Sequence, residues 1–452
     1  MRLFAEYALL PDGPASDVRF DIDDGRFVRI EVGAEPQGTQ RLPGVVLPGF
    51  ANAHSHAFHR ALRGRTHDQG GTFWTWRERM YSVASRLDPD SYLKLARATY
   101  AEMALAGITG VGEFHYLHHA PGGHRYADPN AMAECLRQAA AEAGVRLTLL
   151  DSAYLAGGLG PDGHLPLDEV QQRFSDGDIS AWRSRVAELA PSPGMRVGAA
   201  IHSIRAVPIG ALGEVVESTE QELRSRWDGE GGQIRRAPLH VHLSEQPAEN
   251  EASLACYGYT PTELLQSRGV LGAATTAVHA THLTSSDVLT LGRTGTTACF
   301  CPTTERDLAD GIGPARALLE AGSGLSLGSD QHAVIDLLEE ARGLESHERL
   351  ASLRRGRFRP AELLSALTNH DSIGWPDAGR LEVGARADLV AVRLDSVRTA
   401  GIAPSQVVMV ATSADVDTVM VGGRTVVAAG RHLLGDVAGL LEQAIRPIWE
   451  GL

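Results

Sequence analysis

The sequence predicts a (β/α)8 barrel, a fold of the α/β class, together with a small β-sandwich domain that both termini build. Three observations support this prediction. Short β-rich runs alternate with helical segments, polar residues gather at the ends of those runs, and both termini carry strand-like runs with turn signals. We expect residues 1–44 to form the first part of the sandwich, residues 45–375 the barrel, and residues 376–452 the second part with a tail helix.

Eight β-rich runs predict the barrel, and most are near-continuous apolar stretches, typical of strands buried on both faces of a parallel sheet. The expected strands are 45–52, 107–116, 145–154, 196–205, 238–245, 275–283, 295–304 and 324–330. Helical spacing lies between them, for example over 90–103 before Gly107 and over 130–143 before Gly144. In such barrels the active site lies at the carboxyl ends of the strands.

The two termini have a different pattern. Turn signals at Pro11-Asp12-Gly13 and Asp23-Asp24-Gly25 separate short strand-like runs near the beginning of the chain. Near its end, runs at 387–392 and 418–427 surround Gly422-Gly423, a hairpin signal. We expect these strands to form the sandwich together. Segment 228–234 is rich in glycine and charge and is expected to be an exposed loop.

Composition excludes several classes of protein. The chain has 452 residues and a formal net charge of −14, which argues against nucleic acid or an anionic membrane as a partner. Its apolar runs are shorter than the ~18 residues of a membrane span, and residues 1–12 lack the order of a signal peptide. Cys299-Phe300-Cys301 fits neither a CxxC redox site nor a zinc knuckle. We expect a cytoplasmic protein with buried, reduced thiols.

The motif His54-Ser55-His56 follows the first expected barrel strand. Side chains alternate along a strand, so both imidazoles project from one face, where neutral imidazole suits zinc and other divalent metals. A lone pair of this kind is weak evidence, because a buried histidine is more often a satisfied core residue. His242 and Asp330 end similar strands, however. We expect His54, His56, His242 and Asp330 to hold one divalent metal and to leave a position for water.

Two further residues complete the expected chemistry. A bound metal lowers the pKa of a water from ~15.7 toward ~7, and Glu245, three residues after His242, is placed to carry protons between water and leaving group. His279 is placed to polarise the attacked group or to steady the nucleophile, and Asp330 to hold it as well. His240 precedes His242 by two residues and is an alternative ligand; His242 is preferred because Glu245 follows it.

The only lysine in the sequence, Lys94, falls in an expected helix away from every strand end. Two-metal barrel hydrolases often bridge their metals with a modified lysine of the fourth strand, and the run 197–202 offers neither lysine nor glutamate. A single-metal site is therefore favoured, and lysine Schiff-base chemistry is disfavoured.

Taken together, these motifs resemble the amidohydrolase superfamily. The resemblance rests on segment 48–56, His242 with Glu245, His279, the Ser329-Asp330 pair and segment 379–390, and it spans nearly the whole chain. Within that superfamily the chain resembles the N-formimino-L-glutamate deiminases, through segments 54–61, 73–77, 112–119 and 202–207. The resemblance implies a distorted barrel with a β-sandwich, a single zinc ion and a homodimer. It also implies hydrolysis of a linear amidine, in which N-formimino-L-glutamate and water give N-formyl-L-glutamate and ammonia during histidine degradation.

This substrate carries two carboxylates, so its site needs cationic or hydrogen-bonding groups away from the metal. Arg205 with His202 offers one clamp, and Arg77 on the loop after the first strand offers another, because arginine binds carboxylate through two parallel hydrogen bonds. Tyr116 is expected to hydrogen-bond the substrate. His59 is a fifth candidate for substrate binding, at a position where the family often has glutamine.

Alternative interpretations remain at this stage. Arg77 would merely hold its loop if it stacked on Trp74 or Trp76, and Arg205 would be structural if it formed an ion pair at the barrel rim. The chain could instead be another deaminase or a chlorohydrolase of the same superfamily, acting on a purine, pyrimidine or triazine. A metal-free scaffold is a third possibility, and the presence of all four expected ligands argues against it.

Overall fold

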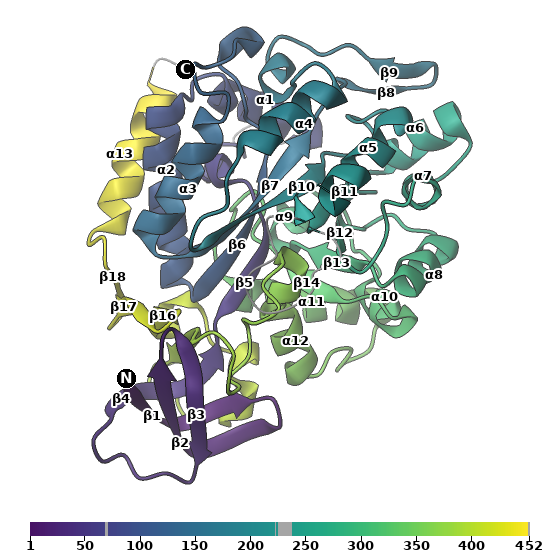
Figure 1. Ribbon diagram of the computed structural model, residues 1–452. Coiled ribbons are helices and arrows are strands. Elements are labelled where there is room, and N and C mark those ends of the chain that lie inside the picture. The colour runs from purple at the N-terminus through teal and green to yellow at the C-terminus, as the bar shows by residue number, and fades with distance from the viewer. Residues whose placement is uncertain (68–70, 222, 225–236, 451–452) are drawn as a thin grey trace.

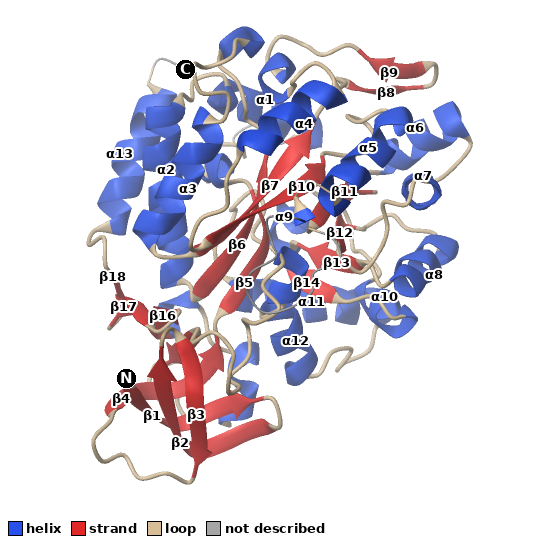
Figure 2. Ribbon diagram, in the orientation of Figure 1, coloured by secondary structure: helices blue, strands red, loops and turns tan. Residues whose placement is uncertain are grey.

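The computed structural model describes residues 1–67, 71–221, 223–224 and 237–450. The expected loop 228–234 lies outside the described residues. A central parallel sheet is surrounded by helices, and a second sheet made by both ends of the chain lies below it (Figures 1 and 2). Within the described residues, no helix combines the length and apolar character needed to cross a membrane.

The sheet of the two termini has eight strands in the order β18-β17-β16-β15-β4-β1-β2-β3. β4 joins the two ends of the chain, because it pairs in parallel with β1 and antiparallel with β15. A small core that includes Phe20, Phe27 and Met420 lies against this sheet. The prediction that strands of both termini come together is confirmed, and they form a single sheet. Its strands are β1 Arg2–Leu10, β2 Gly13–Asp23, β3 Arg26–Val32, β4 Gln40–Pro48, β15 Leu389–Val392, β16 Val416–Val421, β17 Arg424–Ala428 and β18 Arg431–His432.

The hairpin between β16 and β17 turns at Gly422 and Gly423, as the sequence predicts. Both glycines have positive φ angles, 54° and 75°. A two-residue turn with positive φ at both positions matches the twist of the flanking strands, and glycine adopts it without steric cost.

The barrel sheet has eight parallel strands in the order β14-β13-β12-β11-β10-β7-β6-β5. The predicted barrel is confirmed, with one correction to its first strand. The expected run 45–52 is divided: β4 ends at Pro48 in the sheet of the termini, and the barrel strand begins at Phe50. The proposed domain division between residues 44 and 45 therefore falls inside β4. The barrel strands are β5 Phe50–Ser55, β6 Ile108–His115, β7 Arg146–Ala153, β10 Met195–Ile201, β11 Leu239–Leu243, β12 Thr275–His279, β13 Thr297–Phe300 and β14 Leu325–Leu327.

Helices cover the outside of the barrel (Figure 2). Local signals set their ends: the Asp88 side chain accepts a hydrogen bond from Ser91 N at the start of α2, and Gly144 ends α3 at a φ of 77°. The last helix, α13, packs against α2. The helices are α1 Phe73–Ala84, α2 Pro89–Leu105, α3 Ala131–Ala143, α4 Ile179–Glu188, α5 Ile209–Glu220, α6 Pro247–Tyr257, α7 Pro261–Ser267, α8 Ser285–Thr294, α9 Pro302–Asp307, α10 Ala315–Ala321, α11 Leu337–Ser352, α12 Pro360–Leu367 and α13 Val437–Trp449.

Candidate active site

The four expected metal ligands meet at the carboxyl ends of their strands. His54 lies on β5 and His56 just after it, His242 lies on β11, and Asp330 follows β14. His54 Nε2 is 3.3 Å and His56 Nε2 is 3.4 Å from Asp330 Oδ1. His54 Nε2 is also 3.1 Å from His242 Nε2. All four side chains are buried. The four candidate ligand atoms therefore converge on one small volume.

Outer hydrogen bonds fix the orientation of two of these imidazoles. His56 Nδ1 lies 2.8 Å from the carbonyl oxygen of Phe114, and His242 Nδ1 lies 2.8 Å from that of His202. A carbonyl only accepts, so each Nδ1 donates and each Nε2 keeps its lone pair for the shared volume. Burial and the neighbouring imidazoles lower the pKa of His54 and of His242 well below the usual value. Neutral imidazoles with converging lone pairs beside a carboxylate fit one divalent metal.

Backbone strain gathers at the same strand ends. Ser244, His279, Ala280, Asp330 and His332 have φ angles of 50°, 69°, 47°, 42° and 61°. These residues follow or end β11, β12 and β14, and residues other than glycine seldom adopt this left-handed conformation. Such strain persists where the surrounding structure imposes it, which is common at active sites.

Glu245 and His279 lie beside the metal-ligand cluster. Glu245 Oε1 is 3.6 Å from His279 Nε2, and that same nitrogen is 3.8 Å from Asp330 Oδ2. Glu305 Oε1 lies 3.5 Å from the other ring nitrogen of His279. Burial lowers the pKa of His279, but the three carboxyl groups around it raise that pKa further, so the net shift is strongly upward. Burial raises the pKa of Glu245.

Asp310 is a buried carboxyl group near this pair that the sequence analysis missed. It comes together with Glu245 and His279, and Gln246 Nε2 donates a hydrogen bond to its Oδ1. Burial, followed by the neighbouring Glu245, raises the pKa of Asp310 to about 9. The carboxyl group of Asp310 therefore favours its neutral form more than an exposed aspartic acid does. Its position in the loop after α9 gives no sequence signal.

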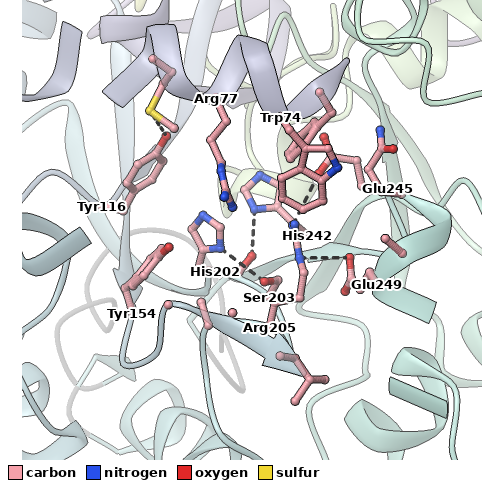
Figure 3. Close-up of a pocket in the computed structure, with 18 of the residues that line it drawn as sticks. Trp74, Arg77, Tyr116, Tyr154, His202, Ser203, Arg205, His242, Glu245 and Glu249 are labelled. Atoms are coloured by element: carbon pink, nitrogen blue, oxygen red, sulfur yellow. Dashed lines mark hydrogen bonds and ion pairs between the residues drawn. The ribbon is translucent and has the colours of Figure 1, made fainter. Parts of the chain in front are cut away.

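A cavity of about 320 Å³ opens next to the metal-ligand cluster. Its wall contains the metal-ligand candidates His56, His242 and Asp330, with Glu245 and His279. All five expected substrate-binding residues also line it: His59, Arg77, Tyr116, His202 and Arg205. Figure 3 shows Arg77, Tyr116 and Tyr154 around this space, together with His202 and Arg205 from the segment after β10. Fold and cavity thus bring the predicted residues together.

Arg205 lies between two carboxyl groups at the cavity wall (Figure 3). Its Nη2 is 3.7 Å from Glu245 Oε2, and its Nε is 3.7 Å from Glu249 Oε2. Burial lowers the pKa of Arg205, but Glu249 and Glu245 raise it more. Within the described residues, Arg205 Nε and both carboxyl oxygens of Glu249 are buried without a hydrogen-bond partner. Arg205 thus has ion pairs, as the alternative interpretation held, but they lie inside the cavity.

Glu249 is a second residue that the sequence analysis missed. It lies on α6 and is 1% exposed. Burial raises the pKa of Glu249 to about 7, although Arg205 opposes this rise. The available signal was its spacing, because Glu249 follows Glu245 by four residues where a helix begins at Pro247.

Arg77 lies on a helix, and the expectation of a loop at Phe73–Arg77 is wrong. Segment 73–77 is the beginning of α1, where Thr75 Oγ1 accepts a hydrogen bond from Thr72 N at 3.0 Å and stabilises the helix start. The Arg77 guanidinium carbon is 4.6 Å from the Trp74 ring centroid and 5.5 Å from that of Tyr81. Arg77 therefore stacks on Trp74, as the alternative interpretation held, and also lines the cavity.

His59 and Tyr116 form a pair on the cavity wall. His59 Nε2 lies 2.9 Å from the Tyr116 hydroxyl, and within the described residues His59 Nδ1 is buried without a partner. His202 lies nearby, with its ring 4.6 Å from the Tyr154 ring in an edge-on arrangement. Burial, and then Arg205, lower the pKa of His202 well below its usual value. These groups offer neutral hydrogen-bonding atoms close to the metal-ligand cluster.

A second buried cluster follows from the histidine-rich segment 112–119. His115, His118 and Asp151 bring possible ligand atoms within 4.8 Å of one another. Here Arg185 donates hydrogen bonds of 2.8 Å to both Asp151 oxygens and others of 2.9–3.1 Å to both Asp176 oxygens. The carboxylates of this cluster already have a cationic partner.

Comparisons with known proteins agree with this geometry. Residues 45–426 match the amidohydrolase family, and residues 1–44 match the N-terminal domain of formimidoylglutamate deiminase HutF. The chain is 36% identical to a formimidoylglutamate deiminase from Pseudomonas aeruginosa, over 95% of both chains. It is 30% identical to an 8-oxoguanine deaminase from the same organism, over 93% of this chain and 90% of that relative.

Solved structures show the same architecture. An amidohydrolase from Brucella melitensis superimposes with a TM-score of 0.88 at 32% identity, over 99% of both chains. An atrazine chlorohydrolase from Arthrobacter aurescens, solved with zinc, superimposes with a TM-score of 0.83 at 21% identity, over 99% of this chain and 100% of that one. The chain belongs to the amidohydrolase family, and its resemblance to the formimidoylglutamate deiminases within that family is confirmed.

Proposed function

We propose that the chain is a metal-dependent hydrolase that converts N-formimino-L-glutamate and water to N-formyl-L-glutamate and ammonia. The 36% identity to a formimidoylglutamate deiminase, together with the matching N-terminal segment, supports this assignment. The observation that carries it is the cavity, in which one wall holds three of the four metal-ligand candidates and the rest holds two arginines for a dicarboxylate.

We assign His54, His56, His242 and Asp330 as the ligands of one divalent metal, with zinc as the expected ion. Their converging lone pairs and charge suit a single ion, and β10 supplies no lysine to bridge a second. When bound, such a metal lowers the pKa of water and polarises the group under attack.

Glu245 and His279 are assigned the proton chemistry. Burial raises the pKa of Glu245, which favours its role as a group that accepts and donates protons. Glu245 takes one proton from the attacking water as its oxygen adds to the formimino carbon, and gives that proton to the terminal imino nitrogen. Glu245 then takes the remaining hydroxyl proton and gives it to the same nitrogen, so that the carbonyl forms, the bond from carbon to nitrogen breaks and ammonia leaves. His279, held between Glu245, Glu305 and Asp330, is assigned to polarise the attacked group or to steady the nucleophile.

The other wall of the cavity is assigned to the substrate carboxylates. Arg205 lies 3.7 Å from each neighbouring carboxyl group, beyond hydrogen-bond distance, so a substrate carboxylate can accept its hydrogen bonds. Arg77 supplies a second cation, while His202, Tyr116 and His59 supply hydrogen bonds around the amidine. A homodimer, a cytoplasmic location and a role in histidine degradation also belong to the proposal, and light scattering on the purified chain tests the first.

Release of ammonia tests the assignment. Zinc-loaded chain is supplied in parallel with N-formimino-L-glutamate, N-formimino-L-aspartate, guanine, 8-oxoguanine and cytosine. We expect turnover of N-formimino-L-glutamate with kcat/KM in the enzyme range of ~10⁴–10⁸ M⁻¹s⁻¹, and at least about tenfold less with every other compound. Preferred turnover of a ring compound would instead favour the purine and pyrimidine deaminases and would remove the carboxylate role from Arg77 and Arg205.

A further inference from the structure

The barrel has a seam between β5 and β14, and the proposed metal ligands lie on both sides of it. Within the described residues, a single bridge between Ser55 and Asp330 joins these strands, whereas the other neighbouring strands share ladders. Two backbone hydrogen bonds accompany it: Asp330 N donates to His54 O at 3.0 Å, and His56 N donates to Asp330 O at 3.3 Å. Backbone pairing alone gives little control over the distance between the His54–His56 pair and Asp330.

The two strands approach closely at this seam. A Cβ atom on Gly328 would lie 2.7 Å from the Cβ and 2.8 Å from the carbonyl oxygen of His54, so only glycine fits there. Small shifts across the seam therefore move a metal ligand directly.

A chain of buried side chains crosses the seam behind the ligands. Asn52 Nδ2 donates to Ser329 Oγ at 2.7 Å, and Ser329 Oγ lies 2.9 Å from His332 Nδ1. His332 Nε2 lies 3.4 Å from Ser55 Oγ, which donates to Glu113 Oε2 at 2.6 Å. All five side chains are fully buried. We call Asn52, Ser55, Glu113, Ser329 and His332 the seam network.

One arrangement of protons satisfies the whole seam network. Ser329 Oγ accepts from Asn52, so its own hydrogen is free to point to His332 Nδ1. The neutral His332 ring then carries its proton on Nε2 and donates to Ser55 Oγ, whose hydrogen points to Glu113. All donors run in one direction and end on a carboxyl group, and such chains reinforce each bond in turn.

Glu113 also holds the backbone that follows the ligand pair. Its Oε1 accepts from Ala57 N at 2.6 Å, directly after His56, while its Oε2 accepts from Ser55 between the two histidines. On the other side, Ser329 N donates to Asn52 Oδ1 at 2.9 Å, directly before Asp330. Each proposed ligand at the seam is therefore next in sequence to a residue that forms hydrogen bonds within the seam network.

We propose that the seam network is a positioning device that sets the spacing between the His54–His56 pair and Asp330 and thereby sets the affinity for the metal. None of its members contacts the substrate cavity, so they are positioning residues. The inference rests on the metal site proposed above. Removing outer partners of metal ligands typically weakens metal binding by about 10- to 100-fold.

The test measures the zinc dissociation constant by competition with a chromogenic chelator, without any substrate. Ser329→Ala removes the hydroxyl that links Asn52 to His332, and we expect about 10- to 100-fold weaker zinc binding. Ser329→Thr keeps the hydroxyl and should restore binding to within about threefold of wild type. Ser253→Ala is the matched control, because Ser253 is also fully buried and donates to Tyr259 O at 2.8 Å, away from the seam.

Thermal unfolding of each metal-free variant separates positioning from general stability. We expect Ser329→Ala and Ser253→Ala to lower the unfolding temperature similarly, while only Ser329→Ala weakens zinc binding. Unchanged zinc affinity in Ser329→Ala, or equal weakening in Ser253→Ala, would overturn the inference. If Ser329→Ala does not fold, Glu113→Gln serves instead, since its amide offers one acceptor oxygen to two donors. Wild-type chain that binds zinc but does not release ammonia would contradict only the proposed substrate.

Discussion

Two buried clusters of histidine and aspartate lie at or near the carboxyl ends of barrel strands, and only one is suited to a metal. In the first, His54, His56, His242 and Asp330 turn lone pairs and a carboxylate toward a shared volume beside the cavity. In the second, His115, His118 and Asp151 are equally close, but Arg185 spans Asp151 and Asp176 with charge-assisted hydrogen bonds. The ligand atoms of the first cluster remain available to bind a cation. In the second cluster the guanidinium of Arg185 already pairs with the carboxylates.

The comparison shows that ligand-type residues in a buried group are not enough to indicate a metal site. Both clusters arise from histidine-rich motifs at strand ends, and both are buried. They differ in what the remaining hydrogen bonds leave open. His56 and His242 use Nδ1 on carbonyl oxygens and keep Nε2 free, while Trp182 Nε1 and Arg185 take up both oxygens of Asp151. The four predictions that follow sharpen or break this contrast.

The largest expected effect is on catalysis at the first cluster. Glu245→Gln keeps the size of the side chain but removes its ability to carry a proton. We expect kcat for N-formimino-L-glutamate to fall by about 10²- to 10⁴-fold while bound zinc stays unchanged, because Glu245 is not a proposed ligand. Steady-state kinetics on variant with measured zinc content provide the check, and an unchanged kcat would remove Glu245 from the mechanism.

At the second cluster, removal of the Arg185 guanidinium should lower the stability of the fold without changing metal binding or catalysis. Arg185→Met leaves Asp151 and Asp176 buried without their guanidinium, a change that typically destabilises by about 3–5 kcal/mol. We expect a lower unfolding temperature, with zinc content and kcat as in wild type at a temperature where both are folded. Loss of zinc in proportion to the loss of stability would mean that the second cluster also takes part in metal binding.

At acidic pH the difference in stability between wild type and Arg185→Met should become smaller. Burial opposes it, but Arg185 lowers the pKa of Asp151, and His119 and Arg185 lower the pKa of Asp176. A carboxyl group with a lowered folded-state pKa stabilises the fold fully above its unfolded value of about 3.9 and loses that contribution below it. The gap in unfolding temperature between wild type and Arg185→Met should therefore be largest near about pH 7 and shrink as the pH falls, because the unpaired buried carboxyl groups of the variant are protonated first. A gap independent of pH down to about pH 3 would contradict the ion-pair account.

The smallest effect concerns substrate binding next to the first cluster. Arg205→Met should lower kcat/KM for N-formimino-L-glutamate by about 10- to 150-fold, matching the roughly 1.5–3 kcal/mol of a hydrogen bond to a charged group. Arg97→Met is the matched control, because Arg97 pairs with Glu142 on the helical surface at 3.1 Å. Equal kcat/KM in the two variants would return Arg205 to a purely structural role.

The sequence predicted the parts of this arrangement that repeat along the chain. Strand ends could be located because buried strands have continuous apolar runs, and His54, His56, His242 and Asp330 sit where such runs stop. The first strand was misplaced because β4 and β5 form one apolar run, and the change of sheet at Gly49 depends on pairing with β15. Pattern alone does not reveal which sheet a strand joins.

Residues whose importance depends on distant neighbours could not be predicted. Asp310 and Glu113 are acidic residues whose burial beside Glu245 and Ser55 is set by the tertiary fold. Arg77 was placed on a loop because the hydrogen bond from Thr72 N to Thr75 that starts α1 was not recognised in a segment rich in aromatic residues.

Zinc content measured by elemental analysis tests the central claim most directly. Wild type, His242→Ala and His118→Ala are purified, exchanged against zinc and freed of loosely bound metal. We predict about one zinc per chain in wild type and in His118→Ala, and less than about one-tenth equivalent in His242→Ala. Zinc retained in His242→Ala but lost in His118→Ala would place the metal in the second cluster and contradict the account.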